Sequence, residues 1–132
     1  MTDIYTARVS YSGSDRLDIT RKSAGPDGLP FAPSWRILKP MLRLRRAAAL
    51  SESRSQGISA AATAYAWPQY VEDYTAEMRA SYRDHRAAWD RILARDEVTL
   101  VCYCVDPLRC HRTLLAEILA KLGAVPRGER PS

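Results

Sequence analysis

The apolar run VTLVCYC, residues 98–104, constrains the fold of this chain more than any other stretch. It holds no charged residue and is rich in β-forming residues, which is typical of a strand covered on both faces. Before it, apolar residues recur at three- and four-residue steps through residues 68–95, which predicts a long amphipathic helix. A second helix is predicted directly after it, at residues 111–122, ending at Gly123. This order of elements indicates an α/β layered domain.

Two further strands are predicted near the N-terminus, Ile4–Ser10 and Arg16–Thr20. The turn-forming link YSGSD between them has five residues, whereas a parallel crossover needs about a dozen. We therefore expect an antiparallel hairpin within a small mixed sheet, in a single three-layer domain spanning residues 1–124. Residues 47–66 are expected to be a variable, mobile insertion, and residues 125–132 a frayed tail.

Length and composition exclude several classes of protein. A chain of 132 residues can bury a hydrophobic core without disulfides or structural metals. Its three cysteines are an odd number, which argues against a disulfide framework. No apolar run approaches the roughly 18 residues of a membrane span, and the first residues lack the pattern of a secretory signal. We expect a soluble cytoplasmic protein with no membrane partner. Its oligomeric state has no signature in the sequence.

The net charge of +5 is concentrated in one segment of the chain. Residues 36–54 carry six basic side chains against one acid, Glu52, so the remainder of the chain is neutral overall. A local basic segment favours an anionic partner, although a solvated helix face is the simpler interpretation. The residues of this nucleic-acid alternative are Arg36, Lys39, Arg43, Arg45 and Arg46.

The stretch VCYCVDPLRCHR, residues 101–112, holds all three cysteines and one of the two histidines. Cys102, Cys104, Cys110 and His111 are of the types that bind structural zinc. In an extended strand, however, residues two apart are separated by about 6.6 Å, whereas thiolates that share a zinc lie about 3.8 Å apart. We therefore predict no cofactor and no metal site, and we keep zinc at these four residues as an alternative.

The same stretch can supply a thiol nucleophile. A thiol near a helix N-terminus and cations has a lowered pKa, and Cys110 stands beside His111 and Arg112 at an expected helix start. Cys104 lies where the strand gives way to a loop. The candidate catalytic residues are thus Cys110, His111 and Cys104, and Cys110 is expected to be a more reactive thiol than Cys102. The sequence leaves open whether the protein is an enzyme.

A third interpretation is an anion pocket. A strand, a short loop and a helix start bring free backbone N–H groups and the positive end of a helix dipole to one place. Open α/β sheets bind ligands beyond the carboxyl ends of their strands, so Arg21 and Arg112 are expected to converge there. We expect a nucleotide, a phosphate or an acidic metabolite. The candidate ligand-binding residues are Thr20, Arg21, Lys22, Ser23 and Arg112.

These residues also resemble a known family. The strand VTLVCYC, the turn VDP and the sequence Cys110-His111-Arg112 at the helix start are similar to the C-terminal motif of the family called domain of unknown function 488. The segments RLDITRKS and FAPSWRIL resemble the first strands of that family and its Pro-Ser segment. The resemblance implies a three-layer α/β domain and no established reaction. It adds Asp18 and Ser34, which stand at motif positions, to the candidate ligand-binding residues.

If the basic segment binds nucleic acid, the affinity for DNA or RNA should fall steeply with salt concentration. Replacing Arg43, Arg45 and Arg46 together by Ala should then remove most of the binding, because each of these arginines would neutralise one phosphate. Filter binding at low and high salt measures both effects. Equal binding by the variant and the native chain would rule this segment out as the nucleic-acid surface.

Overall fold

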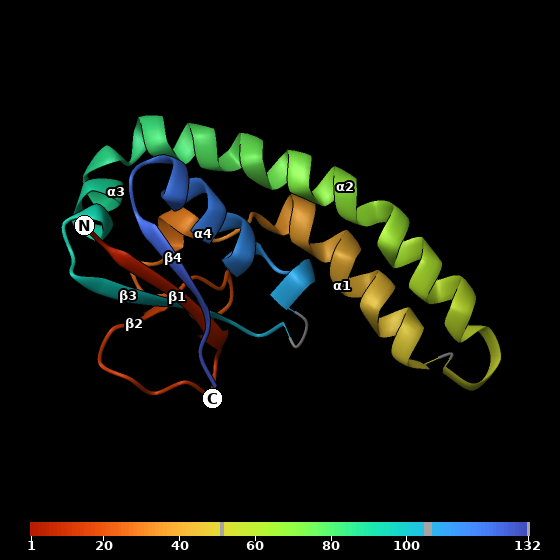
Figure 1. Cartoon of the computed structure of the whole chain (residues 1–132). Helices are drawn as coiled ribbons and strands as arrows, with labels where there is room; N and C mark the ends of the chain where they lie inside the picture. Colours follow the sequence, from red (N-terminus) through yellow and green to blue (C-terminus); the bar gives the residue numbers. More distant parts are fainter. Residues whose placement is uncertain (51, 105–106, 132) are drawn as a thin grey trace.

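The computed structural model shows an α/β domain built on one parallel sheet (Figure 1). It describes residues 1–50, 52–104 and 107–131. Helix α4 lies across the sheet, and the long helix α2 runs above both (Figure 1). The four strands are β1 (Asp3–Arg8), β2 (Arg16–Asp18), β3 (Glu97–Cys102) and β4 (Val125–Glu129), in the order β2-β3-β1-β4. The helices of the described residues are α1 (Trp35–Leu50), α2 (Glu52–Asp84), α3 (Arg86–Leu93) and α4 (His111–Lys121), with the short 3-10 helices η1 (Leu29–Phe31) and η2 (Pro107–Arg109).

The predicted antiparallel hairpin, and with it the mixed sheet, is wrong. β3 lies between β1 and β2 and pairs with both in parallel. The register explains why a short link is sufficient. β1 ends opposite Cys102 of β3, whereas Arg16 of β2 pairs with Thr99, so the chain returns by only three residues, or about 10 Å. A link that covers so short a return needs no crossover helix.

The prediction of a strand covered on both faces is confirmed for β3. Its residues from Val98 to Cys102 are at most 2% exposed. Val98 and Leu100 belong to one core cluster, which also contains buried residues of all four helices. Thr99 points to the other face, where its hydroxyl donates to Asp15 Oδ2 at 2.5 Å and accepts from Arg130 Nε at 3.0 Å. The β1–β2 link and Arg130 therefore cover this second face, in place of the helices of a three-layer domain.

The predicted helix of residues 68–95 is two helices in the structure, because α2 ends at Asp84 and α3 begins at Arg86. His85, which lies at this break, is exposed. Residues 52–66, expected to be an insertion, form the first half of α2, and Pro68 lies inside the helix rather than at its start. Alanine has the highest helix propensity, so an alanine-rich segment extends a helix without apolar periodicity. Helices α1 and α2 pack side by side as a hairpin that projects beyond the sheet (Figure 1).

Residues 125–129, expected in a frayed tail, form the edge strand β4. The pairing continues at both ends, because Val125 N donates to Thr2 O at 2.8 Å and Arg130 N donates to Thr6 O at 2.6 Å. Proline, glycine and mostly exposed side chains give this strand no apolar alternation, which is why the pattern missed it. Among the described residues, no helix has the length and apolar character needed to cross a membrane.

Replacing Trp89 by Ala should lower the free energy of unfolding by about 3–5 kcal/mol, as expected for a large buried aromatic side chain. The Trp89 ring is fully buried, contacts Phe31 at 4.9 Å between centroids, and donates from Nε1 to Ser81 Oγ at 3.1 Å. Trp35 is 44% exposed, so the control Trp35→Ala should cost about 1 kcal/mol or less. Urea unfolding followed by circular dichroism measures both. Destabilisation of equal size in the two variants would contradict this account of the core.

Candidate functional site

The carboxyl ends of the strands meet at one edge of the sheet, where Arg8 of β1 pairs in register with Cys102 of β3. β3 ends at Cys102 rather than at Cys104, and Tyr103 is a half-exposed bend. The chain then passes through η2 and returns at Cys110, which precedes the first turn of α4. This return brings the Cys110 Sγ atom to 2.7 Å from the Cys102 Sγ atom.

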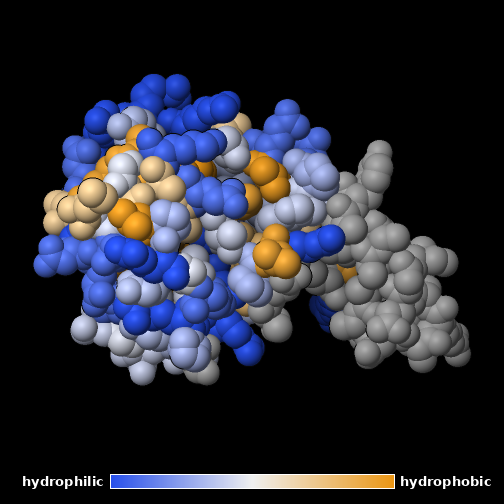
Figure 2. Space-filling model, viewed as in Figure 1, coloured by the Kyte–Doolittle hydropathy of each residue, from blue (hydrophilic) through white to orange (hydrophobic). Residues whose placement is uncertain are grey.

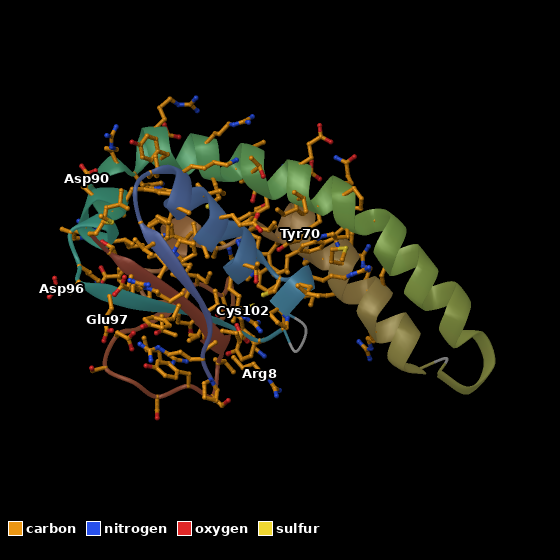
Figure 3. The ribbon with its side chains drawn as sticks, viewed as in Figure 1. Arg8, Tyr70, Asp90, Asp96, Glu97 and Cys102 are labelled. Atoms are coloured by element: carbon orange, nitrogen blue, oxygen red, sulfur yellow. The ribbon has the colours of Figure 1, made fainter. Side chains whose placement is uncertain are left out.

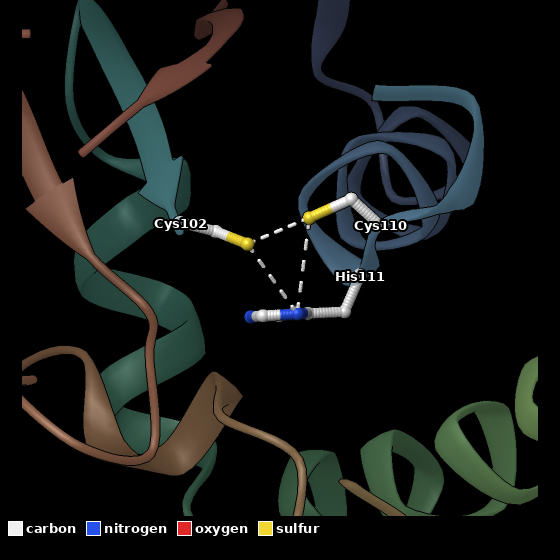
Figure 4. A group of neighbouring side chains, drawn as sticks. All are labelled: Cys102, Cys110 and His111. Carbon is white, nitrogen blue, oxygen red and sulfur yellow. Dashed lines mark hydrogen bonds between the residues drawn. The ribbon is translucent and has the colours of Figure 1, made fainter. Parts of the chain in front are cut away.

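Cys102, Cys110 and His111 converge from β3 and α4, and we call these three residues the thiol–imidazole cluster (Figure 4). The Nδ1 atom of His111 lies 3.8 Å from Cys102 Sγ and 4.0 Å from Cys110 Sγ. The Nε2 atom lies 2.8 Å from the carbonyl oxygen of Ile19. Because a carbonyl can only accept, Nε2 carries a proton, and Nδ1 faces the two sulfur atoms. All three side chains are buried.

The reactivity of Cys110 stays a prediction, and burial of its side chain works against it. Burial raises the pKa of Cys110 well above its ordinary value. A side-chain hydrogen bond with Cys104 is the largest of the causes that raise the pKa of Cys102 to about 12. Side-chain hydrogen bonds with Cys102 and Cys104 raise the pKa of Cys110 further. Both buried thiols are therefore protonated at neutral pH.

Arg112 is fully buried, and its guanidinium is paired inside the protein. Its NH2 atom donates to Glu129 Oε2 at 2.7 Å, its Nε atom to Glu129 Oε1 at 3.2 Å, and its NH1 atom to the Cys104 carbonyl at 2.7 Å. Thr6 Oγ1 donates to the same carboxylate at 2.5 Å. Burial raises the pKa of Glu129, but the hydrogen bonds from Arg112 and Thr6 outweigh it, so the pKa is lowered. Sequence reasoning missed Glu129 because it lay in the expected tail.

The loop after β2 forms a second part of the edge. Asp18 accepts the backbone N–H of Thr20 at 2.8 Å and the hydroxyl of Ser23 at 2.6 Å. Tyr103 OH donates to Ser23 Oγ at 2.9 Å, which joins this loop to the segment that follows β3. Burial raises the pKa of Asp18, but the hydrogen bonds from Ser23 and Thr20 outweigh it and lower the pKa. Lys22 is exposed beside these hydroxyls.

Arg21 and Ser34 line a different feature, an open cavity of about 550 Å³ between the segment before α1 and helix α2. Arg21 donates to the carbonyls of Ala32 at 3.0 Å and of Pro33 at 2.8 Å. Ser34 is bound through its N–H and its hydroxyl to the carboxylate of Glu77. The structure thus gives Arg21 and Arg112 different partners, and the seven candidate ligand-binding residues divide between the edge and this cavity.

The basic residues of α1 form an exposed row. Arg36, Lys39, Arg43 and Arg46 all face solvent, and Arg36 approaches Glu77 Oε2 at 3.5 Å. Their binding to nucleic acid stays a prediction. The side chain of Arg45 and the acidic turn at Val105 and Asp106 lie outside the described residues.

The geometry defines an all-parallel α/β domain with cysteine, histidine and arginine side chains gathered where the central strand ends. A family model described as DUF488-N3a, active DUF488-N3 subclade, matches residues 13–123. The chain therefore belongs to the domain of unknown function 488 family, which confirms the resemblance seen in the motif. The matched range contains the β2 loop, the thiol–imidazole cluster and Arg112, but neither Arg8 nor Glu129. No curated protein and no solved structure matches the chain.

Glu129→Gln should lower the free energy of unfolding at neutral pH by about 3 kcal/mol, because it leaves Arg112 charged and buried without its partner. The pKa of Glu129 is lowered by folding. Its contribution to stability is therefore complete above the pKa of the unfolded carboxyl and is lost as the pH falls through the folded value. Urea unfolding at neutral and acidic pH measures this dependence.

The matched control is Asp3→Asn, which removes the ion pair of Asp3 with Arg127, two more exposed side chains. This change should cost less than about 1 kcal/mol. If Glu129→Gln keeps the native stability at neutral pH, the Arg112–Glu129 ion pair does not stabilise the fold.

Proposed function

We propose that the domain binds a small anionic ligand over the carboxyl edge of its sheet, and that the thiol of Cys104 acts on that ligand. The observation that supports this most directly is the strand register. It brings the ends of β1, β2 and β3 to the same edge, with Arg8 beside Cys102. Open parallel α/β sheets bind their ligands outside this edge. Nucleotides, phosphate and acidic metabolites are the ligand classes that fit.

Arg8 supplies the cation in this proposal, in place of the paired Arg112. Arg8 is exposed at the end of a central strand, and its side chain points to the same face as that of Cys102, its partner in register. Figure 3 shows the Arg8 side chain reaching outward at this end of the sheet. The surface around the sheet is largely hydrophilic in the same view (Figure 2). Lys22, which is exposed on the neighbouring loop, adds a second cation.

Cys104 is the thiol best placed to react with a bound molecule. It is partly exposed, whereas Cys102 and Cys110 are buried with raised pKa values. Its backbone is held on both sides, since its N–H donates to Cys102 Sγ at 3.4 Å and its carbonyl accepts from Arg112. The word "active" in the description of the matched subclade is consistent with chemistry at this edge.

Titration calorimetry with pyrophosphate and with adenosine monophosphate tests the binding step. Arg8→Ala should weaken the affinity at least about tenfold, or 1.4 kcal/mol, because it removes a charge-assisted contact to the anion. Lys121→Ala is the control: Lys121 is exposed and ends α4, far from the carboxyl edge, so its removal should leave the affinity unchanged. Equal affinities of the Arg8→Ala variant and the native chain would contradict the proposed edge.

A short pulse of iodoacetamide, followed by mass spectrometry, tests the thiol in the native chain. Cys104 should label faster than Cys102 and Cys110, and the bound anion should slow its labelling. Labelling of Cys104 that is slow without ligand, or that the ligand leaves unchanged, would remove Cys104 from the site.

A further inference from the structure

We infer that the thiol–imidazole cluster is a binding site for a borderline-soft divalent metal ion, with Zn²⁺ as the best match. The ligand atoms of Cys102, Cys110 and His111 all lie within 4.8 Å of one another. Two thiols and an imidazole are the ligand types that zinc takes from proteins. Figure 4 shows the three side chains pointing to a common centre.

The imidazole is held as a metal-binding histidine would be. A metal-bound histidine usually donates its second ring N–H to a carbonyl or carboxylate, which fixes the orientation of the ring. In this chain the Ile19 carbonyl accepts that hydrogen bond at 2.8 Å and directs Nδ1 toward both sulfur atoms. The carbonyl comes from the segment after β2, so three separate parts of the sheet edge hold the cluster in place.

The distances require one small adjustment. A nitrogen and a sulfur that share a zinc lie about 3.6 Å apart, close to the 3.8 and 4.0 Å from Nδ1 to the two sulfur atoms. Two thiolates that share a zinc lie about 3.8 Å apart, whereas these are 2.7 Å apart. The sulfur atoms must therefore move apart by about 1 Å, which a rotation of the Cys110 side chain can supply.

The charges around the cluster also favour a divalent cation. Each sulfur accepts a hydrogen bond from an N–H group. The Cys104 backbone donates to Cys102 Sγ at 3.4 Å, and Arg112 Nη1 donates to Cys110 Sγ at 3.4 Å. Glu129 already neutralises Arg112. Two thiolates, a neutral imidazole and a divalent ion then form a neutral buried unit, which avoids the cost of an unpaired buried charge. Three protein ligands leave one tetrahedral position open, on a cluster that Cys104 adjoins.

Metal binding to the reduced native chain is the first test. Mass-spectrometric metal analysis after equilibration with Zn²⁺ should give one ion per chain. Co²⁺ in its place should give the absorption bands of tetrahedral cobalt thiolate. Because two protonated thiols must each release a proton, the affinity should rise about 100-fold per pH unit. A reduced chain that binds neither ion, or binding without proton release, overturns the inference.

Variants identify the ligands. Cys102→Ala, Cys110→Ala and His111→Gln should each weaken Zn²⁺ binding by more than about 100-fold, the upper range for removal of a supporting contact. His85→Ala should keep native affinity, since His85 is exposed at the end of α2 and lies outside the cluster. Circular dichroism shows which variants fold. If a variant does not fold, the pH dependence of Zn²⁺ affinity in the native chain tests the metal site instead.

A disulfide between Cys102 and Cys110 is the competing use of the same sulfur atoms, and it does not need His111. Peptide mapping without reductant, compared between the native chain and His111→Gln, separates the two. Native affinity in His111→Gln would overturn the three-ligand assignment. The anion titration is carried out with a metal chelator present, so the failure of one proposal leaves the other standing.

Discussion

The guanidinium of Arg112 is the group on which the arrangement of the site depends. A fully buried cation has to be paired, and its partner Glu129 comes from a strand at the far end of the chain. The same guanidinium holds the Cys104 carbonyl, and Thr6 of β1 holds the same carboxylate. One charge therefore ties the start of α4 to β1, β4 and the loop after β3. It also sets where Cys110 and His111 stand relative to Cys102.

Sequence patterns predicted those elements whose buried residues form a regular apolar pattern in the sequence. Strand β3 and helix α4 contribute buried residues to one core, and both elements were predicted near their true positions. The prediction of an antiparallel hairpin was wrong because the length of the link alone does not determine strand direction when a strand has only three residues. The edge strand β4 has mostly exposed side chains, so nothing in its composition marks it as a strand.

The chemistry of the site was predictable by residue type, but its electrostatics were not. Cys102, Cys110 and His111, three of the four residues named for the zinc alternative, stand together. The pKa values of the thiols depend on desolvation and on the hydrogen bonds among the three cysteines, and both are properties of the folded protein. Arg8 was not predicted as a site residue, because only the strand register places this arginine beside Cys102. Arg21 was assigned to the edge because it follows a strand end, and Ser34 because of its motif position, whereas both residues line a separate cavity.

The insertion of β3 between β1 and β2 has a consequence for how the chain folds. The first two strands are neighbours in sequence, yet neither has its central partner until residues 97–102 exist. During synthesis, the N-terminal strands must wait while about eighty residues emerge, a time of several seconds at roughly 5–20 residues per second. The α1–α2 hairpin joins helices that are neighbours in the sequence, so it can form during that wait. Closure of the sheet, and with it assembly of the site, is thus a late event in the folding of this chain.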